Sequence, residues 1–96
     1  MAALSDEAIQ QGLGKMPGWS YQGKELHKKF TFESFMPGIE FVNKIAHAAE
    51  SAGHHPDITI NYNVVGIGLS THSEGGVTEK DFSLAAKIDQ LHSALP

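Results

Sequence analysis

The chain has 96 residues, enough for one domain and too few for two, so we expect a single domain over residues 1–96. Its formal net charge of −4 argues against direct binding to nucleic acid, because proteins that bind the phosphate backbone usually present a basic face. The chain has no cysteine, which excludes disulfides and thiolate metal sites.

The sequence shows no sign of membrane insertion or export. No apolar run approaches the ~20 residues that are needed to span a bilayer. Residues 1–7 contain no basic residue and turn acidic at once, unlike a secretory signal, and we expect a cytoplasmic protein. A chain of this length buries only roughly 60–65% of its unfolded surface, so association into a homo-oligomer would add to a modest core.

The first third of the chain predicts a short helix and a β-hairpin. Ser5 is a suitable cap for the helix, and Gly12 and Gly14 are expected to end it. Residues 19–22 and 26–32 each alternate between large and small or apolar and polar side chains, with a Gly-Lys turn between them. This pattern is typical of two antiparallel strands.

The segment 34–52 predicts a long helix. Pro37 is tolerated there because it falls in the first turn, where backbone amides have no partner within the helix. Gly53 is a natural stop. Apolar residues recur at steps of four and three, which predicts one buried stripe along the helix. The predicted stripe consists of Phe35, Ile39, Val42, Ala46 and Ala49.

A second hairpin and a last helix complete the pattern. Residues 58–62 and 65–69 alternate on either side of a turn near Asn63. Residues 78–81, Thr-Glu-Lys-Asp, have the form of a capping box that begins a helix. The apolar stripe of this helix is Leu84, Ile88, Leu91 and Leu95.

The order of elements is therefore α-β-β-α-β-β-α. Two hairpins and three amphipathic helices predict an α+β fold, a four-stranded antiparallel sheet with three helices packed on one face.

Three of the six histidines are expected to meet at the second hairpin. With the turn between Asn63 and Val64, His72 pairs with His55, and directly opposed residues have Cβ atoms about 4.5–5.5 Å apart. His54 would then lie beside them. His27, His47 and His92 lack a spacing that suggests a shared site, and we interpret them as ordinary surface or boundary histidines.

Two interpretations of this cluster stay open from the spacing alone. The histidines can be incidental residues at a polar strand end, or a zinc site with Asp57 and Asp81 behind the imidazoles. Asp81 can act only as the acidic member of the helix cap, or it can cap the helix and also orient a histidine.

The chain resembles the pterin-4a-carbinolamine dehydratase family over roughly Leu4 to Leu91. The histidine pair, the later histidine and the aspartate stand at the family's spacing without a gap. The segments that carry the resemblance are Gly53–Asp57, Asn61–Asn63, Leu69–His72 and Gly75–Asp81, supported by Gly18-Trp19 and by Phe30-Thr31-Phe32.

The sequence departs from the family's usual pattern at three places. Ile58 stands where many members have an aromatic residue, and Gly53 where many have a polar one. Gly66 and Gly68 are smaller than usual. These differences bear on pterin packing and on contacts between copies more than on the chemistry.

The resemblance implies that the protein dehydrates a 4a-hydroxytetrahydropterin. His54 and His72 would be the acid–base pair, His55 would hold the pterin and assist, and Asp81 would orient an imidazole. Imidazole suits this work because it can accept or donate a proton near neutral pH. The implied substrate-binding residues are His54, His55, Ser70, Thr71 and His72.

The resemblance also implies the partners. No metal and no organic cofactor is expected, since the pterin is the substrate. The family forms homodimers and homotetramers, and some animal members also act as dimerisation cofactors of a homeodomain transcription factor. The alternative to the enzyme is therefore a protein-interaction module, and a zinc-dependent hydrolase is a third possibility.

Overall fold

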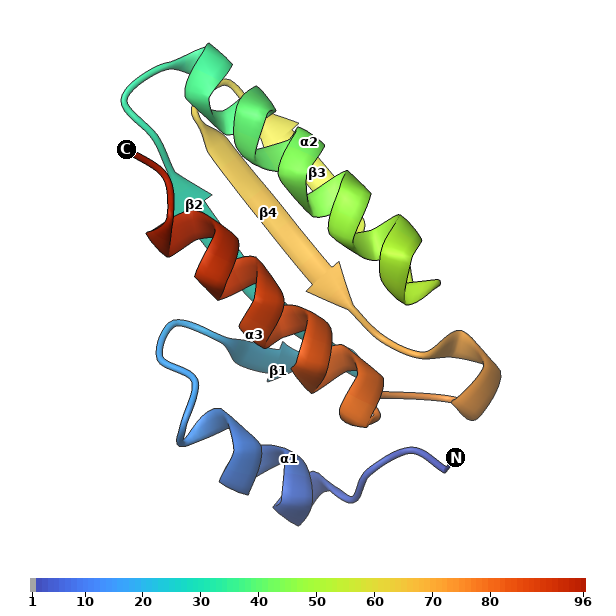
Figure 1. Ribbon diagram of the computed structural model, residues 1–96. Helices are drawn as coiled ribbons and strands as arrows, with labels where there is room; N and C mark the ends of the chain where they lie inside the picture. Colours follow the sequence, from blue (N-terminus) through green and yellow to red (C-terminus); the bar gives the residue numbers. More distant parts are fainter. Residues whose placement is uncertain (1) are drawn as a thin grey trace.

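The computed structural model describes residues 2–96 and confirms the predicted order of elements (Figure 1). No helix in that range is both long and apolar enough to cross a bilayer. The helices are α1 (Asp6–Leu13), α2 (Phe35–Ala52) and α3 (Glu79–Ser93), the strands are β1 (Ser20–Gln22), β2 (Glu25–Thr31), β3 (Asp57–Asn61) and β4 (Val64–Leu69), and a single 3-10 turn, η1, covers His72–Glu74.

The four strands form one antiparallel sheet in the order β1-β2-β4-β3. All three helices lie on one face of it, with α2 and α3 side by side across the sheet and α1 beyond β1 (Figure 1). The predicted α+β class is therefore confirmed. The core fills the space between the sheet and the helices, and its largest fully buried side chains include Phe41 of α2, Leu26 of β2 and Ile88 of α3.

The helix α2 turns a different face to the core from the one predicted. Its buried residues are Gly38, Phe41, Ile45 and Ala49, so only Ala49 of the predicted stripe is fully buried, and Val42 is partly buried against the core. Phe35 is 45% exposed, and Ala46 is exposed as well. Both sets of residues follow helical spacing, because α2 is apolar over more than half of its circumference.

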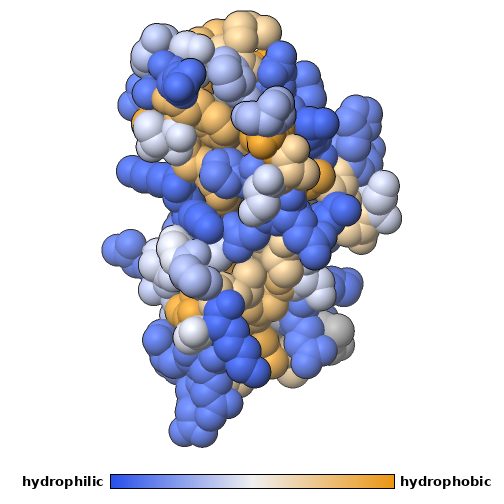
Figure 2. All heavy atoms as spheres, turned by 60° about the vertical axis from the view of Figure 1, so that its left-hand side comes forward, coloured by the Kyte–Doolittle hydropathy of each residue, from blue (hydrophilic) through white to orange (hydrophobic). Residues whose placement is uncertain are grey.

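The large apolar side chains that are exposed, Phe35 among them, gather at one end of the molecule. Phe35 and the 57% exposed Met36 begin α2, and Ile60 and the 63% exposed Tyr62 lie at the turn between β3 and β4. The side-chain amide of Asn63 donates to the carbonyl of Phe32, which ties this turn to the segment before α2. On the face in Figure 2, hydrophobic residues are visible between the hydrophilic side chains that cover most of it.

The register of the second hairpin also differs from the prediction. Asp57 pairs with Gly68 and Ile58 with Ile67, which centres the turn on Tyr62 and Asn63. Tyr62 has a φ of 51°, a conformation that L-residues seldom adopt, so no local signal in the sequence points to a turn at this residue. The predicted pairing of His72 with His55 is wrong, because this register lies two residues away and β4 ends at Leu69.

The first helix continues through a glycine that was predicted to end it. Gly12 lies inside α1, and Gly14 follows the last helical residue as the cap. A Cβ atom at position 12 would lie 2.7 Å from ring atoms of Phe82, so this glycine allows α1 and α3 to approach each other.

A polar clamp fixes α3 against the first hairpin. The carboxylate of Asp89 accepts a hydrogen bond from Nε1 of Trp19 at 2.9 Å and another from Nζ of Lys28 at 2.8 Å. Lys28 also lies 4.9 Å from the ring centroid of Phe30, within reach of a cation–π interaction. The clamp joins residues 70 positions apart in the chain, so it holds the last helix to the start of the sheet.

We expect Asp89→Ala to lower the free energy of unfolding by about 2 kcal/mol, because Trp19 and Lys28 both lose a charged acceptor in a partly buried position. Urea denaturation measures the change. Glu40→Ala on the exposed surface of α2 is the matched control and should stay within about 0.5 kcal/mol of the wild type. Equal stability of all three proteins would show that the clamp contributes no net energy.

Candidate active site

The candidate site is built around the carboxylate of Asp81, which is fully buried at the start of α3. Its Oδ2 atom accepts hydrogen bonds from the backbone N–H of Thr78 and from the hydroxyl of Thr71, each at 2.9 Å. Its Oδ1 atom accepts one from Nε2 of His54 at 2.5 Å. The capping box predicted from the sequence is confirmed, and the same aspartate that closes it also contacts a histidine.

The two threonine hydroxyls behind the carboxylate have fixed roles, because each has only one proton to donate. Thr71 donates to Asp81, so the 2.9 Å contact between the two hydroxyls must run from Thr78 to Thr71. The oxygen of Thr78 in turn accepts from the backbone N–H of Lys80. Every member of this buried chain is thereby satisfied, and the orientation of the carboxylate is fixed.

Local chain geometry brings His54 to this carboxylate. Gly53 ends α2 in the left-handed conformation with a φ of 62°, and the backbone N–H of His54 bonds to the carbonyl of Ala49 in the last turn of the helix. The side chain of His54 is only 13% exposed. Glycine at position 53, a departure from the family pattern, suits this turn because it adopts positive φ without strain.

The contact with Asp81 also decides which nitrogen of His54 is free. A carboxylate only accepts hydrogen bonds, so Nε2 of His54 must carry the proton that points at Asp81. In the neutral imidazole the remaining nitrogen, Nδ1, then has an unshared electron pair. An imidazole held in this way can take a proton at Nδ1 while Asp81 stabilises the positive charge that results.

His55 has a similar partner in a different environment. Its Nε2 atom lies 2.5 Å from Oε2 of Glu50, but the two side chains are 63% and 76% exposed, so water screens their attraction. Sequence reasoning missed Glu50. The signal available was its place in the last turn of α2, from which a side chain can reach residues that follow the helix.

The later part of the predicted site follows the end of β4. Thr71 is buried, and its backbone N–H bonds to the carbonyl of Gly76, which folds residues 71–76 into a closed loop. Ser70 and His72 line a small hollow of about 230 Å³ on the outside of this loop. Hydrogen bonds therefore join His54, Thr71 and Asp81, whereas His72 lies next to Thr71 in the chain without sharing the contacts of Asp81.

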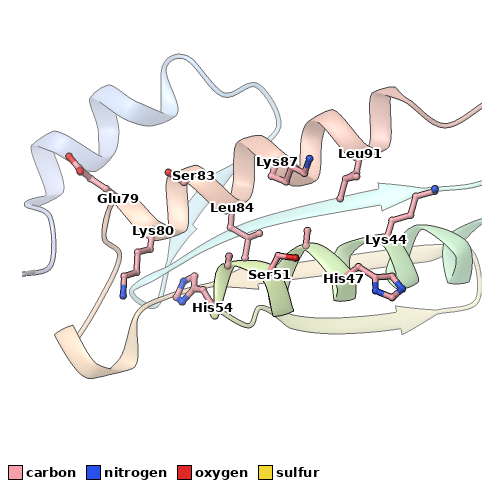
Figure 3. A pocket seen from close by; sticks show the side chains of 12 residues that line it. Lys44, His47, Ser51, His54, Glu79, Lys80, Ser83, Leu84, Lys87 and Leu91 are labelled. Atoms are coloured by element: carbon pink, nitrogen blue, oxygen red, sulfur yellow. The ribbon is translucent and has the colours of Figure 1, made fainter.

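A larger groove opens beside His54 between α2 and α3 (Figure 3). Its volume is about 870 Å³, which is in the range of small-molecule sites. His54 and Lys80 lie at one end of it, and Lys44 lies at the other. The site thus has a held imidazole at the end of a groove, and His72 lines a second hollow next to Thr71, whose hydroxyl contacts the same carboxylate as His54.

The described residues do not assemble a metal centre. Within residues 2–96, no three histidine, aspartate or glutamate side chains are grouped so that they could hold a metal ion. The Nε2 atom of His54 is already occupied by the contact with Asp81. The contact with Asp81 orients the imidazole of His54, an arrangement that suits proton transfer.

The chain is similar to known proteins over nearly its whole length. The family model described as "Pterin 4 alpha carbinolamine dehydratase" matches residues 2–91. A relative from Sulfolobus acidocaldarius, named "Putative pterin-4-alpha-carbinolamine dehydratase", is 50% identical over 88 residues, which is 92% of this chain and 97% of the relative. A relative of the same name from Acidobacterium capsulatum is 48% identical over 91 residues, which is 95% of this chain and 99% of that relative.

Two solved structures are also similar. The first, titled a transcriptional coactivator/pterin dehydratase from Brucella melitensis, has a TM-score of 0.89 and 32% identity, and the match covers 93% of this chain and 97% of that one. The second is titled a pterin dehydratase-like protein that is a RuBisCO assembly factor in the alpha-carboxysome. Its TM-score is 0.69 with 30% identity, over 83% of this chain and 95% of that one.

We expect Thr71→Val to lower the free energy of unfolding by about 1–3 kcal/mol, because Oδ2 of Asp81 loses a donor and the Thr78 hydroxyl loses its acceptor in the interior. Thermal or urea denaturation measures the loss. Thr31→Val, at an exposed position at the end of β2, is the control for the same change of side chain. A Thr71 variant no less stable than this control would contradict the buried network.

Proposed function

Because the chain belongs to the pterin-4a-carbinolamine dehydratase family, we propose that it eliminates water from a 4a-hydroxytetrahydropterin and releases a quinonoid dihydropterin. The product would be returned by a reductase to an aromatic amino acid hydroxylase. The observation that supports this most strongly is the pairing of His54 with the buried carboxylate of Asp81, which prepares one imidazole for proton transfer.

The reaction needs two proton transfers and no redox step. The bond between carbon 4a and its hydroxyl breaks, and the departing oxygen takes a proton to leave as water. The adjacent ring nitrogen loses its proton, and its electron pair forms the new carbon–nitrogen double bond. One acid and one base on the protein are therefore sufficient, and positioned catalysis of this kind typically contributes on the order of 10²–10⁴-fold.

In this proposal His54 and His72 supply the two transfers. His54 acts through Nδ1, and Asp81 holds its ring in one orientation and balances the charge of the imidazolium. Thr71 acts through the carboxylate, because its hydroxyl already donates to Asp81. His55 and Ser70 contact the pterin, and Glu50 restrains the ring of His55.

We expect the double variant His54→Ala, His72→Ala to accelerate the decay of 4a-hydroxytetrahydropterin little above the spontaneous rate, and Asp81→Asn to lose on the order of 10²-fold or more. Asparagine keeps an acceptor for the helix cap but turns an amide toward His54, which reverses the tautomer of the imidazole. Stopped-flow absorbance measures the rates, and His27→Ala on β2 is the control.

The same assay tests the absence of a cofactor. Wild-type enzyme prepared with a chelator should be as fast as untreated enzyme, because the proposed chemistry uses only imidazoles. Normal rates in the double variant would overturn the proposal. Loss of activity with the chelator, restored by added zinc, would replace it with the metal-dependent alternative.

A second candidate function, a protein-interaction module, is supported by a specific surface. The exposed side chains of Phe35, Met36, Ile60 and Tyr62 gather at one end of the molecule, where they can bury apolar area against another chain. The two similar structures are of a transcriptional coactivator/pterin dehydratase and of a RuBisCO assembly factor, both roles that involve other proteins. We propose a homodimer or homotetramer as the first use of this surface, and a transcription factor as a further partner.

Light scattering coupled to size exclusion should give an oligomer for the wild type and a smaller species for the double variant Phe35→Gln, Met36→Gln, which removes apolar area from that surface. Glu33→Gln, Glu40→Gln is the control at exposed positions nearby. A wild type that stays monomeric at the highest concentration measured would contradict self-association through this end.

A further inference from the structure

The groove between α2 and α3 is much larger than the part beside His54. Three of the α2 residues that line it, Ala48, Ser51 and Ala52, are small, which leaves space between the two helices, and Lys44 and His47 lie at the end away from His54 (Figure 3). Leu84 and Leu91 point into it from α3 (Figure 3). The result is an apolar floor that starts at the candidate catalytic histidine and continues along both helices.

The groove is positively charged although the chain is acidic. Three of the seven basic residues of the chain, Lys44, Lys80 and Lys87, line it, against one acidic residue, Glu79. In Figure 3 the side chain of Glu79 is directed away from α2. Among residues 2–96, none of these lysines has a carboxylate within 4.0 Å, so their charges are available to a ligand.

The lysines are arranged along the groove rather than at one point. Lys80 lies at the His54 end, whereas Lys87 and Lys44 lie farther along, on opposite helices (Figure 3). Lys80 and Lys87 are seven residues apart on α3, which corresponds to about 10 Å along the helix axis. A pterin ring held at His54 therefore leaves the far pair of lysines beyond the reach of a short hydroxyalkyl substituent.

We propose that the groove binds an extended, anionic substituent of the pterin substrate, with an apolar or aromatic linker over the leucines and a carboxylate or phosphate at Lys44 and Lys87. This inference rests on the proposed dehydratase function and names the substrate class of the same site. The charge of the groove and its continuity with His54 favour such a substituent, because a neutral side chain would leave the lysines without a partner.

The test compares three reduced pterins with the same ring: one with a neutral hydroxyalkyl chain, one with an arylcarboxylate tail and one with an alkyl phosphate. Calorimetry at low ionic strength gives each Kd. We expect the better anionic ligand to bind at least about tenfold more tightly than the neutral one, and the preference to weaken as salt screens the lysines. Comparison of the two anionic ligands shows whether the groove prefers a carboxylate or a phosphate.

The double variant Lys44→Gln, Lys87→Gln should bring the ratio of the neutral and anionic Kd values close to one. The control Lys15→Gln, Lys29→Gln removes the same charge from a loop and from the face of β2, and it should keep the wild-type ratio. A wild type without anionic preference, or a preference that survives the Lys44 and Lys87 changes, would overturn the inference.

The same measurements distinguish failure of this inference from failure of the proposed dehydratase function. Accelerated dehydration of the neutral substrate with no anionic preference would leave the dehydratase standing and remove the inference alone. Failure of every pterin to bind would remove both. Binding of an acidic amphipathic peptide in the groove, together with no binding of any pterin, would mean that the groove serves a protein partner instead.

Discussion

A buried, ionised side chain must be compensated by donors, and in this protein that requirement organises the site. Asp81 has no exposed surface, and three donors from three different segments meet its two oxygens. They come from the start of α3, from the loop after β4 and from His54, the second residue after α2. The positive end of the α3 dipole also favours the carboxylate. Burial of such a charge would be costly if any of these donors were missing, so the local fold and the orientation of His54 depend on one interaction.

The adjacent histidines show how environment separates residues that look equivalent in the sequence. His54 and His55 each contact a carboxylate at 2.5 Å through Nε2. The partner of His54 is fully buried and already fixed by two other donors, whereas Glu50 is an exposed side chain with rotamer freedom of its own. The first pair keeps one tautomer and one orientation. The second is screened by water and adaptable, which suits a residue that contacts substrate more than one that must transfer a proton in a fixed geometry.

Local signals in the sequence predicted the elements well, because a cap, a turn residue or an alternating strand is specified within a few residues. The capping box at Thr78 and the hairpin at Gly23 are examples. The face of α2 was wrong because Phe35 and Phe41 belong to two stripes of equally good helical period, and only tertiary packing chooses between them. The second hairpin was misplaced because Tyr62, not a residue known for left-handed geometry, occupies the turn.

The sequence indicated candidate residues for the site but not the contacts between them. The motif and its family resemblance indicated His54, His72 and Asp81, and the helix cap suggested that Asp81 could serve twice. The shared hydrogen bonds of Thr71, the contact of Glu50 and the groove between α2 and α3 depend on how helices and loops meet in space. No spacing along the chain encodes those distances.

The unfilled groove bears on how the fold balances stability against function. A 96-residue domain has a small core, and larger side chains at Ala48 and Ala52 would bury more apolar area between α2 and α3. Lysines at the rim oppose closure of the groove, because their ammonium groups would lose hydration without gaining a carboxylate. The small side chains of Ala48 and Ala52 in the floor of the groove and the lysines at its rim both keep the space open to a ligand. The same helix packs its Phe41 side into the core and presents Phe35 to solvent, so α2 contributes to the core, the groove and an exposed apolar surface at once. That three-sided use explains why α2 is apolar over more than half of its circumference.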